Sequence, residues 1–194
     1  VEIVNGEITL NAEAKTGYVL YPAGSEAPRV AGDFGSGTPI ENPNFDATDL
    51  SGWTVETTEA AEVSVAKNPT TWETYLQMTG DKGASASVSQ TMTGLTPGKR
   101  NTVYFFAELD DDTQLEATVE IAGKTYKQTA LPTDMKHYSF SKFWDTEYQK
   151  VRIAFDVPEG VDTAKLTVSA AFNRDDAQVK LDEAQQQIHK RHYQ

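Results

Sequence analysis

The sequence predicts an all-β protein, built as a β-sandwich or a barrel. About ten short segments alternate in polarity or are rich in β-branched and aromatic residues, and turn signals separate them at short intervals. Helical periodicity is weak throughout, and the chain has no internal repeat. Together these observations favour a sandwich or barrel over a helical or α/β fold.

The first 22 residues predict strands of a different unit. VEIVNGEITL alternates around Asn5-Gly6, the strongest short hairpin signal, and GYVLYP (17–22) is aromatic and β-branched. Three strands cannot bury a core alone. We therefore expect 1–24 to be the closing strands of a preceding sandwich, with 25–37 as a Gly-, Pro- and Ser-rich linker. The chain begins without Met or a signal peptide, so we expect a piece of a longer protein.

The main domain is predicted over 38–188, with 189–194 as a tail. RNTVYFFAEL (100–109) is nearly continuous and apolar in its middle, which is typical of a central strand. Only EAQQQIHKRHYQ (183–194) has any helical character, and fraying or disorder is the alternative there. The other predicted strands are 53–58, 61–66, 73–80, 85–94, 115–123, 124–131, 137–143, 148–158, 164–172 and 177–184.

Composition excludes several functions. With 17 basic and 29 acidic residues the net charge is −12, which disfavours nucleic-acid binding. The chain has no Cys, so it contains no disulfide and no thiolate chemistry. No apolar run approaches the roughly 18 residues that span a bilayer, so membrane insertion is not expected.

Catalysis is not expected either. Only three His are present, at 137, 189 and 192, and two of them lie in the tail. Paired carboxylates for glycoside hydrolysis normally lie in a deep cleft, whereas a short-looped sandwich offers a shallow one.

Four phrases in a fixed order carry a family resemblance: NPNFD…LSGWTVE, SVSQTMTGLTPGK, VRIAFDVPEGVDTAKLTVSAAF and VKLDEA. Over 38–188 they resemble the galactose-binding-like jelly rolls appended to bacterial glycoside hydrolases. The resemblance implies that ENPNFDATDLSGW forms the opening strand, with Phe45 and Trp53 in the core. The join of EITLNAEAKTGYVLYPAG to GDFGSGTPIENPNFDATDLSGWTV further resembles the region after the catalytic barrel of endo-α-N-acetylgalactosaminidases, glycoside hydrolase family 101.

The jelly-roll resemblance also implies a structural Ca²⁺ shared by the first and last strands, which pair edge to edge in such folds. Asp46 and Asp182 stand at the two carboxylate positions. Carbonyls near Glu41, Asn42 and Asn44 would complete the shell of six to eight oxygens that Ca²⁺ prefers. The alternative is that both acids are solvent-exposed residues at strand ends.

Aromatic residues in polar loops are the candidate sugar contacts, because flat rings stack on the apolar face of a pyranose. Trp72 lies in NPTTWETY with Tyr75 three residues on, and Trp144 lies in KFWDTEY with Tyr148 nearby. The alternative is that each Trp caps one end of the core.

The resemblance leads to one main functional hypothesis. The chain is expected to be a non-catalytic carbohydrate-binding module of a secreted or bacterial cell-surface enzyme that cleaves mucin-type O-glycans. Its expected partners are a glycan containing galactose or N-acetylgalactosamine and the catalytic domain of the same chain. The alternative is a structural spacer that packs on the catalytic domain and binds no sugar.

Overall fold

The computed structural model describes residues 3–4, 7–8, 40–45, 48–67, 74–134 and 148–189. The predicted strands at 17–22 and 137–143, and the predicted linker at 25–37, lie outside these ranges. The division of the chain into 1–24, 25–37, 38–188 and 189–194 stays a prediction.

A short hairpin lies near the start of the chain. Strands β1 (Ile3–Val4) and β2 (Glu7–Ile8) pair antiparallel and belong to a separate unit from the main domain. Ile3 pairs with Ile8, so two residues, Asn5-Gly6, connect the strands. The hairpin predicted around Asn5-Gly6 is confirmed.

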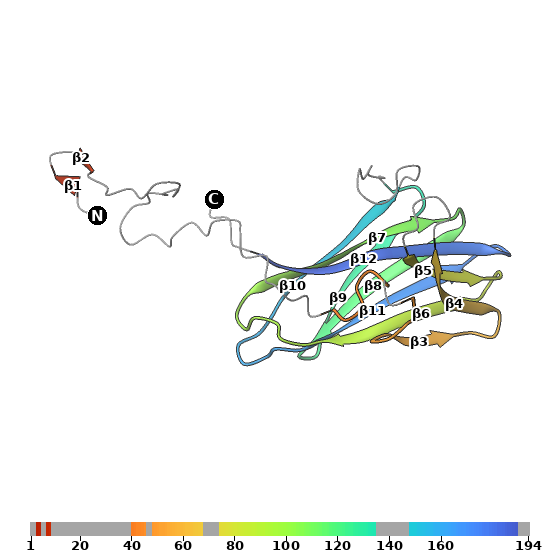
Figure 1. Cartoon of the computed structure of the whole chain (residues 1–194), viewed down its shortest axis with the longest axis horizontal. Coiled ribbons are helices and arrows are strands. Elements are labelled where there is room, and N and C mark those ends of the chain that lie inside the picture. The colour runs from red at the N-terminus through yellow and green to blue at the C-terminus, as the bar shows by residue number, and fades with distance from the viewer. Residues whose placement is uncertain are drawn as a thin grey trace. The chain divides into compact units, whose positions relative to one another are not determined.

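The main domain consists of two five-stranded sheets. Its strands are β3 (Thr54–Thr57), β4 (Ala61–Lys67), β5 (Thr74–Gly80), β6 (Ser85–Met92), β7 (Arg100–Leu109), β8 (Thr113–Ile121), β9 (Lys124–Ala130), β10 (Gln149–Asp156), β11 (Ala164–Phe172) and β12 (Ala177–His189). One sheet, which we call the β7 sheet, has the order β10-β7-β12-β5-β4, and the other, the β11 sheet, has the order β3-β6-β11-β8-β9 (Figure 1). All the strand pairs in both sheets are antiparallel.

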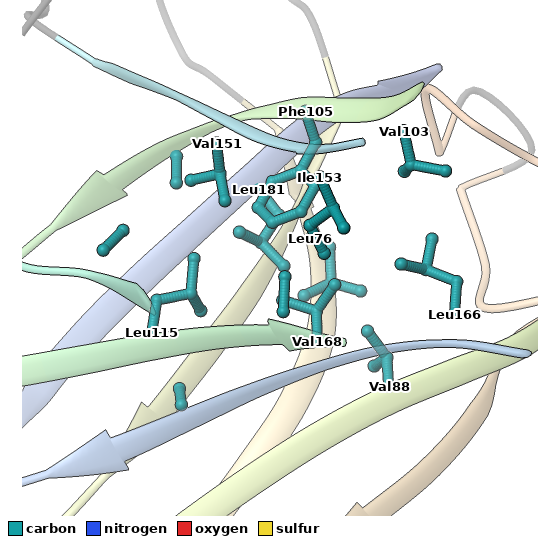
Figure 2. Packing of buried hydrophobic residues seen from close by; sticks show 14 of the residues in the cluster. Leu76, Val88, Val103, Phe105, Leu115, Val151, Ile153, Leu166, Val168 and Leu181 are labelled. Atoms are coloured by element: carbon teal, nitrogen blue, oxygen red, sulfur yellow. The ribbon is translucent and has the colours of Figure 1, made fainter. Parts of the chain in front are cut away.

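A single hydrophobic core lies between the two sheets. Because successive strand side chains point to opposite faces, every second residue turns inward. Figure 2 shows these inner side chains from both sheets meeting in one layer. Each large apolar side chain buried in this way contributes roughly 1.5–3 kcal/mol to folding. Among the most buried are Leu76, Val103, Phe105 and Phe155 from the β7 sheet, and Val88, Leu115, Leu166 and Val168 from the β11 sheet.

The prediction of an all-β sandwich is confirmed, and no helix occurs in the described residues. β7 lies between β10 and β12, so its prediction as a central strand is confirmed. Within the described part of the chain, nothing forms an apolar helix of the length that a membrane crossing needs.

The predicted opening strand is wrong in one respect. The described residues between Ile40 and Gly52 form turns and bends rather than a strand. Positive φ angles of 46° at Asn42, 56° at Phe45 and 58° at Thr48 break the extended backbone. The expected burial is confirmed, because Phe45 is 2% and Trp53 9% exposed.

The expectation for the tail is also wrong for 183–189. These residues continue β12 as a strand rather than forming a helix. Over 185–189 β12 pairs with β7, from Gln185 opposite Tyr104 to His189 opposite Arg100, and this ladder outweighs the helix preference of the Glu and Gln residues. A register shift between Asp182 and Gln185 accommodates the extra length.

The first and last strands of the domain do not pair. β3 lies at the edge of the β11 sheet, whereas β12 lies at the centre of the β7 sheet. Val179 and Leu181 place β12 over the middle of the core, where hydrogen bonds form on both sides of the strand.

Candidate functional site

The structure describes part of the predicted sites. Tyr75, Tyr148, Asn42 and Asn44 are described with their side chains. Trp72, Trp144 and Asp46 lie outside the described residues, and for Asp182 only the position in β12 is described. The proposed roles of Trp72, Trp144, Asp46 and Asp182 therefore stay predictions.

The outer surface of the β7 sheet carries three partly exposed aromatic side chains, which we call the aromatic face: Tyr75, Tyr104 and Phe106. Tyr75 comes from β5, where Leu76 is fully buried, and the alternation turns Tyr75 outward. In β7 the same alternation turns Tyr104 and Phe106 outward, and their ring centroids lie 6.1 Å apart, edge to face.

Tyr148 supports this face from its edge. Its ring packs edge to face on Phe106, with centroids 4.7 Å apart, and the residue is 4% exposed. A ring so buried has no free face for a sugar. We therefore infer that Tyr148 orients Phe106, which differs from its predicted role as a direct sugar contact.

Two lysines lie over the aromatic rings. The Lys150 Nζ is 4.0 Å from the ring centroid of Tyr104 and 5.7 Å from that of Phe106, and the Lys180 Nζ is 5.7 Å from that of Tyr75. These distances fall within the roughly 6 Å range of cation–π attraction. The face therefore combines apolar ring surface with ammonium donors.

Glu108 completes the polar part of the face. It lies opposite Lys180 in the β7–β12 register, and the Lys180 Nζ donates to the Glu108 Oε1 at 3.1 Å. Glu108 thus brings a carboxylate acceptor beside the rings. Aromatic surface flanked by a few donors and acceptors is the usual composition of a site for small polar ligands.

Sequence reasoning missed Tyr104 and Phe106. The run VYFF in RNTVYFFAEL predicts the apolar middle of a central strand, which does not separate its two faces. The usable signal was the period of two, because Val103 and Phe105 fill one face and Tyr104, Phe106 and Glu108 the other.

The 40–53 loop joins the two sheets through hydrogen bonds. The Gln90 side chain of β6 donates to the Glu41 carbonyl at 3.1 Å and accepts from the Glu41 N–H at 2.8 Å. The Thr74 Oγ1 of β5 donates to the Asn44 carbonyl at 3.2 Å. The loop is therefore attached to one strand of each sheet.

Trp53 is fixed within the same loop. Its Nε1 donates to the Asn42 carbonyl at 3.2 Å, and its ring lies 5.7 Å from that of Phe45. The Asn42 Nδ2 donates to the Asp49 and Ser51 carbonyls at 3.0 and 3.3 Å. Asn42 therefore acts as a cross-link in the loop, which accounts for two large apolar side chains in a polar turn.

These contacts bear on the predicted calcium site. The Glu41 carbonyl accepts a hydrogen bond from Gln90, the Asn44 carbonyl accepts one from Thr74, and the Asn42 carbonyl accepts two, from the Trp53 Nε1 and the Phe45 N–H. Thr74, whose side chain donates to the Asn44 carbonyl, is the first residue of β5. β5 pairs with β12 as far as Leu181, the residue before Asp182. The backbone thus brings the 40–45 loop toward β12. Among the described residues, no group of three or more His, Asp or Glu side chains gathers as a metal site.

The fold is a β-sandwich of the kind found in carbohydrate-binding modules. The carbohydrate-binding module TmCBM61, solved in complex with beta-1,4-galactotriose, is similar with a TM-score of 0.62 and 18% identity, over 79% of this chain and 100% of that one. The enzymatically active domain of bacteriophage CBA120 tailspike protein 4 is similar with a TM-score of 0.60 and 13% identity, over 78% of this chain and 21% of that one. At these identities the likeness shows the fold.

The family follows from the sequence. The profile described as "Endo-alpha-N-acetylgalactosaminidase, domain 5" matches residues 40–179. The chain therefore belongs to this domain family of glycoside hydrolase family 101. A Renibacterium salmoninarum protein provisionally named an endo-alpha-N-acetylgalactosaminidase is 26% identical over 94% of this chain, which spans 11% of that relative's length.

Proposed function

We propose that this domain is a non-catalytic carbohydrate-binding module and that it binds glycan on the aromatic face. The enzyme carrying it would be secreted or held at a bacterial cell surface and would act on mucin-type O-glycans. The ligand would contain galactose or N-acetylgalactosamine, and binding would keep the catalytic domain of the same chain near its substrate. The family match supports this parent enzyme, and the carbohydrate-binding-module fold supports the sugar-binding role.

The observation that carries the proposal is the outward placement of Tyr75, Tyr104 and Phe106 on the β7 sheet. Aromatic side chains on the outer face of a sheet add nothing to the core, and together they form an apolar surface flanked by Lys150, Lys180 and the Glu108 carboxylate. A pyranose ring has an apolar face for the rings and hydroxyls for the charged groups, so it fits this composition.

The test is calorimetric titration with galactosides and N-acetylgalactosaminides, after a glycan array has selected the ligand. Tyr104→Ala and Tyr75→Ala are expected to weaken binding about tenfold each, which corresponds to about 1.4 kcal/mol. The matched control is Thr167→Ala on the outer face of the β11 sheet, which should leave affinity unchanged. All three residues are partly exposed, so the melting temperatures should change little.

Two results would contradict the proposal. Tyr104→Ala and Tyr75→Ala with wild-type affinity would move the site away from this face, and Trp72→Ala and Trp144→Ala would then test the loop platform predicted from the sequence. Absence of binding to any glycan would leave a structural spacer that packs on the catalytic domain.

A further inference from the structure

A hollow of about 400 Å³ is lined by residues of β9 and β10 and by Asp134. β9 and β10 are edge strands of the two sheets (Figure 1). Among the described strands, each of these two pairs with a neighbour on one side only. The volume falls at the small end of the range for ligand sites, roughly 300–1,000 Å³. The lining residues are Gln128, Thr129, Ala130, Asp134, Gln149, Lys150, Val151 and Arg152.

One buried group in this lining is unsatisfied. Gln149 is 4% exposed, and its Nε2 donates to the Leu131 carbonyl at 2.5 Å. Its Oε1 is buried and accepts no hydrogen bond. A buried amide oxygen without a donor is destabilising, and in native proteins such a group requires an explanation, of which a bound partner is one.

The lining selects a ligand that both donates and accepts. The Gln149 Oε1 and the Asp134 carboxylate only accept, and the Asp134 Oδ2 already takes the Leu131 N–H at 2.8 Å. Lys150 and Arg152 only donate. A hydroxyl group does both, so a ring carrying several hydroxyls matches this mixture better than an anion or a cation alone.

We propose that this hollow is a second binding site, which takes a single sugar residue by hydrogen bonding rather than by stacking. The site goes beyond the aromatic face, because its described lining contains no aromatic side chain. The two sites meet at Lys150, which lines the hollow and also lies over Tyr104. A glycan branch on the aromatic face would thus have a neighbouring position for one further residue.

The test is an NMR titration of the chain with free galactose and, separately, free N-acetylgalactosamine. The expected result is saturable shifts of the backbone amides of 128–134 and 149–152. Gln149→Met keeps the side-chain volume and removes the acceptor, and it should weaken these shifts about tenfold, or about 1.4 kcal/mol. Tyr75→Ala should leave them unchanged, since Tyr75 belongs to the aromatic face alone.

A second pair of variants covers the case in which Gln149→Met does not fold. Thr129→Val should weaken the same shifts several-fold, and its matched control is Thr118→Val, a half-buried threonine on the neighbouring strand β8 outside the hollow. No saturable shift at 128–134 and 149–152 would overturn the proposal, as would unchanged affinity in both Gln149→Met and Thr129→Val. The hollow would then hold water alone. Either result leaves the Tyr104→Ala test of the aromatic face independent.

Discussion

The two outer faces of the sandwich differ far more than its two inner faces. The β7 sheet turns rings, lysines and a carboxylate outward, whereas the β11 sheet turns out mainly small hydroxyl side chains. On the latter, Ser89, Thr167 and Thr118 stand opposite one another across three strands, with Ser87 and Ser169 in the next row. Folding requires only the inner alternation, so the outer positions are free to specialise, and here one sheet has done so.

The largest expected effect tests whether the inner faces are equivalent. Leu76 and Leu166 are both fully buried, one in each sheet. Leu76→Ala and Leu166→Ala should each destabilise the fold by about 2–5 kcal/mol, because both leave a cavity in the same core. Urea denaturation measures this, with Thr167→Ala, at a partly exposed position, as the control. If the losses of unfolding free energy in the two variants differ severalfold, the two inner faces are not equivalent.

Calcium is the next largest expected effect. We propose that Asp46 and Asp182, with the carbonyls of the 40–45 loop, hold a structural Ca²⁺ that strengthens the junction between the two sheets. EDTA should then lower the melting temperature, and added Ca²⁺ should restore it. At a Ca²⁺ concentration a hundred times its Kd, the ion should add about 2.7 kcal/mol to the free energy of unfolding.

The control for calcium lies in the same loop. Asp46→Ala should melt at one temperature with or without EDTA, whereas Asp49→Asn should keep the full response, since the Asp49 carboxylate is already bonded to Ser51. If EDTA does not change the melting temperature of the wild type, the calcium proposal is wrong. Asp46 and Asp182 would then be exposed residues at strand ends.

A smaller effect compares one ion pair on each outer face. The Glu108–Lys180 pair is 3.1 Å apart with side chains 31% and 24% exposed, and the Glu116–Lys127 pair is 2.9 Å apart with side chains 36% and 55% exposed. Because the distances are similar, burial should decide the energies. Double-mutant cycles should give an interaction energy of about 0.5–1 kcal/mol for the Glu108–Lys180 pair and less for the Glu116–Lys127 pair. Added salt should weaken the interaction of the Glu116–Lys127 pair more strongly. The reverse order would mean that the aromatic face does not shield its charges.

The smallest effect concerns pH and the 40–53 loop. Hydrogen bonds from the Ser51 side chain and backbone lower the pKa of Asp49 below its usual value of 3.8. Any stability from this group is therefore present above pH 3.8 and is lost as the pH falls through the lower pKa of the folded state. Melting of wild type and Asp49→Asn should differ slightly at neutral pH and converge in strong acid. A difference that grows in acid would contradict this assignment.

The fold could be predicted because its signals are local. Alternation in segments such as LEATVEIAG and AKLTVSAAF identified strands whose inner residues are almost completely buried. Asn5-Gly6 set a hairpin register in the same way. The place of β12 could not be predicted, because strand order depends on contacts between residues about seventy positions apart, such as Lys180 and Glu108.

The candidate site was harder to predict. Tyr75 was identified from its loop neighbours, but Tyr104 and Phe106 were hidden in an apolar run whose two faces have different roles. The 40–53 loop showed the opposite problem. The family resemblance implies a strand there, whereas hydrogen bonds from Asn42, Gln90 and Thr74 hold turns that no periodicity indicates.

The central position of β12 has a consequence for how the domain forms. Before β12 is in place, β4 and β5 pair with each other, and β7 pairs with β10, but nothing joins these two pairs within the sheet. β12 follows all of them in the chain and bonds to β5 and β7 at once. On the ribosome, the β7 sheet would therefore stay open until the last strand emerges. We expect slow folding, because the pairing of β12 with β5 and β7 closes a long stretch of chain and comes as the late step.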